Sequence, residues 1–137
     1  MELSLKKYLT AALKWLIPFL LLEFLIGILR LAGIAETESF ALISAVNVLF
    51  LLLPGMCFLA MFFVFKKKCK SFIPAEGVIA NWNSGFYRYT GSVIIKIDEK
   101  EFSTSAYFSS EECKDMVGKT VTYAIIDEIL FIYAVKD

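Results

Sequence analysis

The sequence holds few of the side chains that perform chemistry in proteins. It has no histidine, which removes the commonest general base and metal ligand along with Ser-His-Asp and Cys-His catalysis. The three cysteines are scattered without a CxxC pair, so neither a disulfide framework nor a zinc site is predicted: Cys57, Cys69 and Cys113. We therefore expect no catalytic residue, no metal site, no cofactor and no enzymatic activity.

The carboxylates of the second half occupy positions that are typical of turns and of a solvated helix. Turn positions hold Asp98, Glu99, Glu101, Asp127 and Glu128, and a short predicted helix holds Glu111, Glu112 and Asp115. Acidic residues at turns ordinarily serve solubility and turn geometry. The sequence contains no glycine-rich phosphate loop and no activated nucleophile, so these carboxylates predict no reaction.

Three polar residues stand out because long apolar stretches surround them: Glu23, Arg30 and Asn47. The stretches run from 15 to 35 and from 40 to 65 and are joined by the acidic link 36–39. A helix rises about 1.5 Å per residue, so about 20 residues cross a hydrocarbon core of roughly 30 Å. Each stretch therefore predicts a transmembrane helix, and the short link predicts an antiparallel hairpin.

A charged residue near the middle of a span costs roughly 2.5–3.5 kcal/mol on insertion scales. Glu23 is therefore expected either to be protonated or to meet a polar group of another helix. Measured from the link, Glu23 lies opposite Leu51 to Leu53, which offer no partner, whereas Arg30 and Asn47 lie at similar depth and can face each other. Glu23, Arg30 and Asn47 are our candidate contacts with a partner helix or a second copy; the alternative is that Glu23 is merely tolerated at the surface of the hairpin.

Charge divides the chain into three regions. An amphipathic leader, 1–14, carries Lys6, Lys7 and Lys14; the hairpin, 15–70, ends in a basic stop; and a tail follows at 71–137. Apolar residues make up 58% of the chain, more than the roughly 45–50% of soluble domains. The mean hydropathy is correspondingly high, at +0.68. Because lysines flank the spans and the link carries Glu36 and Glu38, the positive-inside rule predicts that both termini are cytoplasmic. We expect an integral protein of a bacterial inner membrane or plasma membrane.

The tail alternates as β-strands do. Predicted strands are 77–82, 87–97, 101–108, 120–126 and 129–135, with a helix begun by the capping pair Ser109 and Glu112. This order predicts a small five-stranded OB-like barrel, with an SH3-like barrel as the alternative. The last strand is almost wholly apolar, which predicts burial on both faces, against the membrane-proximal segment or a second copy.

Nucleic acid is not an expected partner. Stacking faces are available from Trp82, Phe86, Tyr87, Tyr89, Tyr107 and Tyr123. However, residues 75–137 carry ten acidic residues against six basic ones, and affinity for nucleic acid depends on neutralising phosphates with Lys and Arg. The aromatics are better interpreted as the core and rim of the barrel.

The tail resembles the NfeD-like family. The resemblance is carried by Gly77-Val78-Ile79, by 91–98 (GSVIIKID), by 100–106 (KEFSTSA), by 117–121 (VGKTV) and by the strand 129–132. The resemblance covers about the last 60 residues. The chain departs from the family's pattern in having only two spans and in its tyrosine-rich segment, 87–90. The resemblance implies transmembrane helices followed by an OB barrel, partners of the stomatin or flotillin type, and no catalysis.

The expected function is therefore that of a membrane hairpin that displays a non-catalytic interaction or scaffold module at the cytoplasmic surface. Its expected partners are the lipid bilayer and either other membrane proteins or further copies of itself. The alternative function is an accessory subunit of a membrane transporter or channel, with Glu23 at a helix–helix interface.

Overall fold

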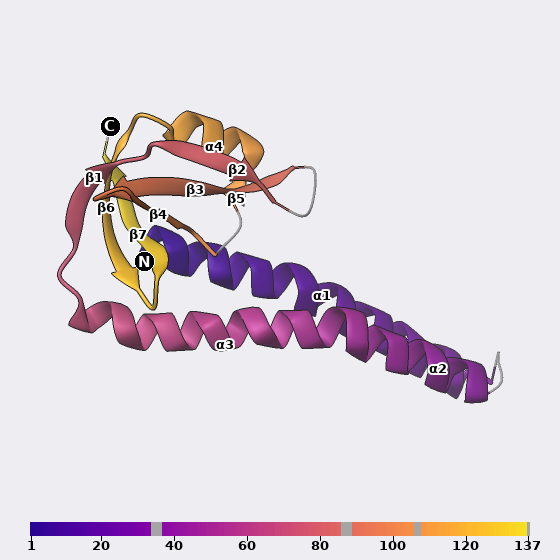
Figure 1. The fold of residues 1–137 in the computed structure, drawn as a ribbon. Helices are drawn as coiled ribbons and strands as arrows, with labels where there is room; N and C mark the ends of the chain where they lie inside the picture. Colours follow the sequence, from indigo (N-terminus) through magenta and orange to yellow (C-terminus); the bar gives the residue numbers. More distant parts are fainter. Residues whose placement is uncertain (34–36, 86–88, 106–107, 137) are drawn as a thin grey trace. The chain divides into compact units, whose positions relative to one another are not determined.

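The computed structural model describes residues 1–33, 37–85, 89–105 and 108–136. The chain forms two compact units: Leu9–Met61, and Met1–Tyr8 together with Phe62–Asp137. The first unit is helical, and the second contains the antiparallel strands and the short helix α4 (Figure 1). The predicted combination of long apolar helices followed by β-structure is confirmed.

The first long helix, α1, runs without interruption from Leu3 to Leu31. It ends earlier than the predicted residue 35, because Gly33 adopts a left-handed conformation (φ 66°) and its N–H turns back to the carbonyl of Arg30 (3.1 Å). Glycine adopts this conformation without steric cost, which makes it a common helix terminator. The helix α2 then begins at Thr37, three residues before the predicted start.

The second stretch is helical throughout but changes pitch in the middle. The helix α2 (Thr37–Asn47) passes into a π-helical turn, η1 (Val48–Leu52), and then into α3 (Leu53–Lys68). Pro54 has no N–H to donate to the carbonyl of Phe50, and the N–H of Leu53 instead reaches back five residues to Val48. Pro54 thus lies just after a widened, π-helical turn.

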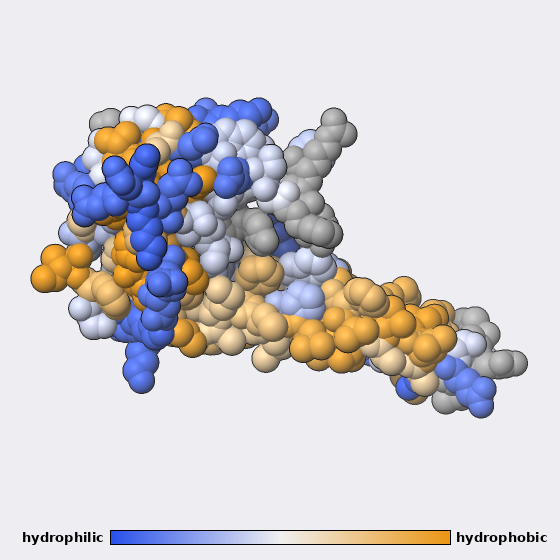
Figure 2. Space-filling model, in the orientation of Figure 1, coloured by the Kyte–Doolittle hydropathy of each residue, from blue (hydrophilic) through white to orange (hydrophobic). Residues whose placement is uncertain are grey.

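Both stretches are long and apolar enough to cross a membrane, over Leu3–Leu31 and Glu38–Ser71. Their large apolar side chains are mostly exposed, and Figure 2 shows this surface as a continuous orange band along the helices. The most exposed examples are Leu20, Leu21, Phe24, Leu31, Leu42 and Phe50. A soluble protein would bury such a surface.

Two antiparallel sheets make up the second unit. One has the order β1–β6–β7, from Ala75–Val78, Thr120–Ile126 and Ile129–Lys136; the other has the order β2–β3–β4, from Asn81–Ser84, Thr90–Ile97 and Lys100–Ser103. The two-residue strand β5 (Phe108–Ser109) also pairs with β3. Their buried side chains form one core, which includes Ile79, Val93, Ile95, Phe108, Cys113, Val121, Leu130 and Ile132.

The predicted first strand, 77–82, is divided between the two sheets. β1 pairs with β6 and β2 pairs with β3. Between them, Ile79 exchanges hydrogen bonds with the loop before β6: its N–H donates to Lys119 and its carbonyl accepts from Gly118. Ile79 is 1% exposed, so the bend places its side chain in the core shared by both sheets.

The predicted strand 101–108 is also divided, into β4 and β5. At the break, the buried Thr104 accepts a hydrogen bond from the N–H of Val93 through Oγ1 (3.3 Å). The predicted helix start is confirmed: Ser109 caps α4 (Ser110–Met116), and its Oγ accepts from the N–H of Glu112 (3.2 Å). The start of the predicted strand 87–97, and Ala106 and Tyr107, lie outside the described residues.

The first half of the last strand, β7, is buried on both faces, as its apolar sequence predicts, whereas Ala134 in the second half is exposed. Leu130 and Ile132 point into the core, and Phe131 stacks on Phe65 at the end of α3, with ring centroids 5.9 Å apart. At a β-bulge, Tyr133 has no paired residue on β6. The hydroxyl of Tyr133 donates a hydrogen bond to the carbonyl of Cys69 (2.8 Å). The end of α3 and the residue that follows it thus cover the outer face of β7 at Phe131 and Tyr133.

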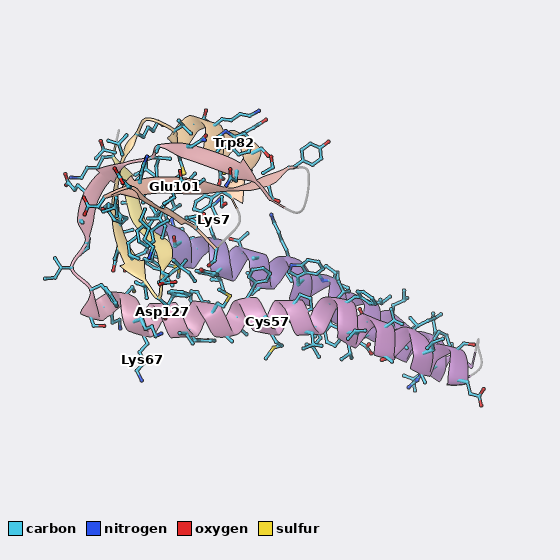
Figure 3. The ribbon with its side chains drawn as sticks, in the orientation of Figure 1. Lys7, Cys57, Lys67, Trp82, Glu101 and Asp127 are labelled. Atoms are coloured by element: carbon cyan, nitrogen blue, oxygen red, sulfur yellow. The ribbon has the colours of Figure 1, made fainter. Side chains whose placement is uncertain are left out.

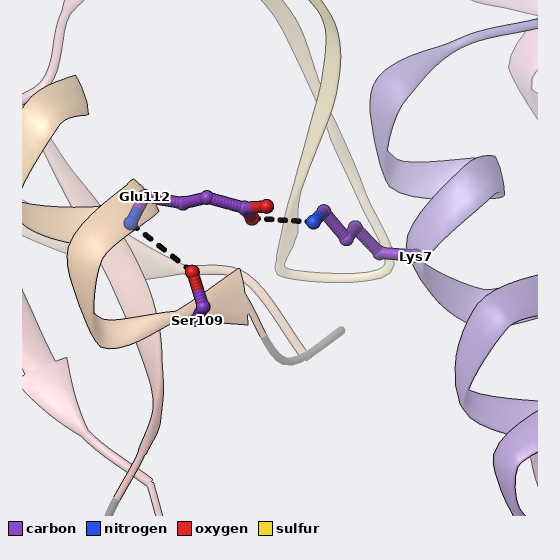
Figure 4. Close-up of polar contacts among 3 residues, drawn as sticks. All are labelled: Lys7, Ser109 and Glu112. Atoms are coloured by element: carbon purple, nitrogen blue, oxygen red, sulfur yellow. Dashed lines mark hydrogen bonds and ion pairs between the residues drawn. The ribbon is translucent and has the colours of Figure 1, made fainter.

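The first eight residues of the predicted leader, 1–14, belong to the β-containing unit. Ser4, 1% exposed, accepts a hydrogen bond from the N–H of Ile132 (2.8 Å). Tyr8, also 1% exposed, stacks on Phe65 and shares a hydrogen bond with Ser105. Lys7 forms an ion pair with Glu112 on α4 (Figure 4).

The hairpin turns after β3 and after β6 place acidic residues in the left-handed region: Asp98 and Glu99 in the first, and Asp127 and Glu128 in the second. Glu99 has φ 68°, a conformation that glycine adopts without strain. We expect Glu99→Gly to raise the free energy of unfolding by about 0.5–1 kcal/mol, measured by thermal unfolding of the full chain in detergent. The matched variant Glu101→Gly, within β4, should lower it, and stabilisation by both would contradict the turn assignment.

Cys113 reports on the core of the same unit. Burial, followed by the neighbouring Glu112 carboxylate, raises the pKa of its thiol to about 11. Because the thiolate is the reactive form, we expect alkylation of Cys113 to be slow at pH 8 and to accelerate as the pH rises towards 11. Mass spectrometry of the full chain after maleimide treatment measures this rate, and alkylation at pH 8 as fast as that of an unfolded control would contradict it.

Candidate functional site

The carboxyl group of Glu23 is the centre of a polar cluster in the helical unit. Ser44 on α2 donates its hydroxyl to Oε1 (2.7 Å) and lies 3.0 Å from Oε2. Asn47, at the end of α2, donates its amide to Oε1 (3.0 Å) and more weakly to the carbonyl of Phe19 (3.4 Å). Two neutral side chains of α2 thus donate hydrogen bonds to a carboxyl group of α1.

The prediction that Glu23 lies opposite Leu51 to Leu53 is wrong. That estimate placed the centre of the link at residues 36–39, whereas α1 ends at Leu31 and α2 begins at Thr37. The earlier turn shifts the pairing of the antiparallel helices by about two helical turns towards the N-terminus of α2. Glu23 therefore meets Ser44 and Asn47 instead of leucines.

The predicted pairing of Arg30 with Asn47 is not what forms, because the amide of Asn47 is used by Glu23 and Phe19. Arg30 is exposed, and it lies seven residues after Glu23, which is close to two turns along the same face of α1. The structure thus brings Glu23 and Asn47 together and leaves Arg30 apart from them. Whether the three residues contact a partner stays a prediction.

Asn47 occupies a position with two unusual features. It is 3% exposed, and its Oδ1 is buried with no hydrogen-bond partner within the described part of the chain. It also immediately precedes the π-helical turn η1, and such turns occur often at functional sites. Because its amide hydrogens reach both Phe19 and Glu23, Asn47 fixes the orientation of the carboxyl group.

Ser44 was missed by the sequence analysis. The available signal was its spacing, since residues three apart on a helix lie on the same face, and Ser44 precedes Asn47 by three. The cluster offers a hydroxyl, an amide and a carboxyl group. Among the described residues, no group of three or more His, Cys, Asp or Glu side chains could hold a metal ion. The chemistry it supports is hydrogen bonding and charge pairing between helices.

The aromatic residues considered for stacking have separate locations. Tyr123 is buried in the core, and Trp82 is half-buried with Lys114 Nζ 5.8 Å from its ring centroid. Tyr89 is 75% exposed, whereas Phe86, Tyr87 and Tyr107 lie outside the described residues. In Figure 3, Trp82 lies on β2 near α4, and Lys7 extends from the N-terminal helix beneath it. These positions are those of core and rim residues.

Comparison of the chain with protein-family models, with curated proteins and with solved structures finds no match. Function must therefore be inferred from the residues themselves.

Proposed function

We propose that the chain is an integral membrane protein whose two apolar helices hold a non-catalytic β domain at the cytoplasmic surface, where it acts as an interaction or scaffold module. The observation that carries this proposal is the apolar surface of both helices, which is long enough to span a bilayer and largely exposed. In a bilayer this surface is solvated by lipid, as transmembrane helices require.

The distribution of charge supports an orientation with both termini inside. Lys66, Lys67 and Lys68 lie in the last turn of α3 and Lys70 follows it, whereas Glu38 begins the first turn of α2. Positive residues remain on the cytoplasmic side during insertion. Lys67 points away from α3 (Figure 3), as expected of a side chain that meets water and lipid headgroups.

An OB-like barrel is the form of the β domain that we favour. The bend at Ile79 lets one chain segment join both sheets, through β1 to β6 and through β2 to β3. α4 lies between the strands that correspond to the third and fourth of an OB barrel. β4 contacts β7, and we infer that this contact closes the barrel. An SH3-like barrel is the structural alternative.

The interaction role follows from how the core is filled. The interior of the β domain is occupied by its own apolar side chains, so a partner would bind its outer surface. Val78 (52% exposed) and Val117 (39% exposed) contribute apolar surface there. The resemblance to NfeD-like proteins suggests stomatin- or flotillin-type scaffold proteins as partners.

Site-specific photo-crosslinking in intact cells tests this role. A photoreactive amino acid at Val78 or Val117 should yield a discrete crosslinked complex, and the full chain should migrate above its monomeric mass of 15.5 kDa in mild detergent. The same amino acid at exposed Lys96 on β3 serves as a comparison. A chain that remains monomeric and uncrosslinked at every position would contradict an interaction role.

A second candidate function is that of an accessory subunit of a transporter or channel. The contacts of Glu23 with Ser44 and Asn47 beside a π-helical turn favour it. Glu23→Gln separates the two functions. Loss of a transport phenotype with the complex intact would favour the accessory subunit, whereas loss of assembly alone would favour the scaffold.

A further inference from the structure

Glu23 carries a carboxyl group that forms no ion pair within the described part of the chain. Its carboxyl group accepts hydrogen bonds from the neutral side chains of Ser44 and Asn47. Among the described residues, Arg30 takes part in no ion pair either. A carboxylate inside a bilayer is costly unless it is paired. The side chain is half-buried, so one side of it remains open to another helix.

The surface next to Glu23 is suited to close helix packing. Gly27 follows Glu23 by one turn of α1, which places the two residues on the same face. A methyl group added at Gly27 would meet nothing within 4 Å, so the space in front of it is free. Small residues allow transmembrane helices to approach closely enough for polar side chains to bond across the interface. Leu20 and Phe24, 63% and 70% exposed, flank this face.

A second copy of the chain is poorly matched to this face. Arg30 is the one basic residue between 15 and 65, and it lies seven residues, or about 10 Å along the helix, from Glu23. Copies inserted in the same orientation would set Glu23 opposite Glu23, with each Arg30 displaced towards the link. Charge complementarity therefore favours a different helix.

We propose that the Glu23–Gly27 face of α1 binds a transmembrane helix of another protein that carries a lysine or arginine at the depth of Glu23. Ser44 and Asn47 hold the carboxyl group in place, so little conformational freedom is lost when the cation arrives. This inference rests on the proposed membrane insertion and names the chemistry of the partner.

The test uses the fluorescently labelled full chain in phosphatidylcholine vesicles and three synthetic leucine-rich transmembrane helices. One has a single lysine at the depth of Glu23, one has the lysine displaced by seven residues, and one has none. Energy transfer should show association roughly tenfold tighter for the first helix than for the other two. Glu23→Gln should abolish the difference and Gly27→Leu should weaken it, whereas Glu38→Gln, in the exposed first turn of α2, should leave it unchanged.

Equal binding of the three helices to the wild-type chain, or an unchanged lysine preference in Glu23→Gln, would overturn the inference. Competition by unlabelled full chain as effective as the lysine helix would also overturn it, in favour of a second copy. Alkaline extraction of the same vesicles separates the two failures. A chain that is extracted overturns the proposed membrane insertion and the inference with it, whereas an inserted chain without a lysine preference overturns the inference alone.

Discussion

Replacing Tyr8 by alanine is expected to lower the free energy of unfolding of the β-containing unit by about 3–5 kcal/mol, the range found when large aromatic side chains are removed from cores. Tyr8 is 1% exposed and lies almost parallel to the ring of Phe65, with centroids 5.3 Å apart. Its hydroxyl also shares a hydrogen bond with Ser105. Alanine would leave a cavity and an unpaired serine.

Hydrogen exchange of the β6 and β7 amides in the full chain in detergent measures this effect. Tyr8→Phe keeps the ring and loses one hydrogen bond, so it should cost only about 1 kcal/mol. Lys6→Ala, at an exposed position on the same helix, should change little. Wild-type exchange rates in Tyr8→Ala would show that the N-terminal residues do not belong to this unit.

Gly91→Val is expected to be the second most damaging substitution, at about 2–3 kcal/mol or more. A Cβ at Gly91 would lie 2.7 Å from the carbonyl oxygen of Asn83, 3.1 Å from the Trp82 ring and 3.2 Å from the sulfur of Cys113. The closest of these atoms belongs to the paired strand β2, so it cannot move without breaking the sheet.

Chemical denaturation of the full chain, followed by the exchange of β3 amides, measures the loss. Ser92→Ala, the next residue on the same strand and half-exposed, should stay within about 0.5 kcal/mol of the wild type. If Gly91→Val were tolerated as well as Ser92→Ala, the packing of β2, β3 and α4 around this glycine would be incorrect.

Local signals predicted much of the fold. The apolar stretches, the capping pair Ser109 and Glu112, and the two acidic turns each depend on residues close together in sequence, and the structure has them where they were expected. The burial of both faces in the first half of β7 also followed from composition, because an almost wholly apolar strand needs a cover on each side.

The remaining features depend on contacts between distant residues. The predicted pairing of the two long helices was wrong because Gly33 ends α1 earlier than the apolar stretch suggests. The partners of Glu23 were missed for the same reason. The leader was predicted to be an amphipathic region because lysines lie among its leucines. Nothing local shows that Ser4 meets Ile132, 128 residues away. The division of the first strand at Ile79 likewise depends on Gly118 and Lys119 in a distant loop.

Cysteine accessibility in intact cells tests the central claim most directly, since the account requires a membrane hairpin with the β domain in the cytoplasm. Three introduced residues are informative in a background without native cysteines: Glu38→Cys at the start of α2, Lys67→Cys at the end of α3 and Lys119→Cys before β6, all at exposed positions. We predict that an impermeant maleimide labels Glu38→Cys in intact cells, and labels Lys67→Cys and Lys119→Cys only after permeabilisation. Labelling of Lys119→Cys in intact cells would contradict the account.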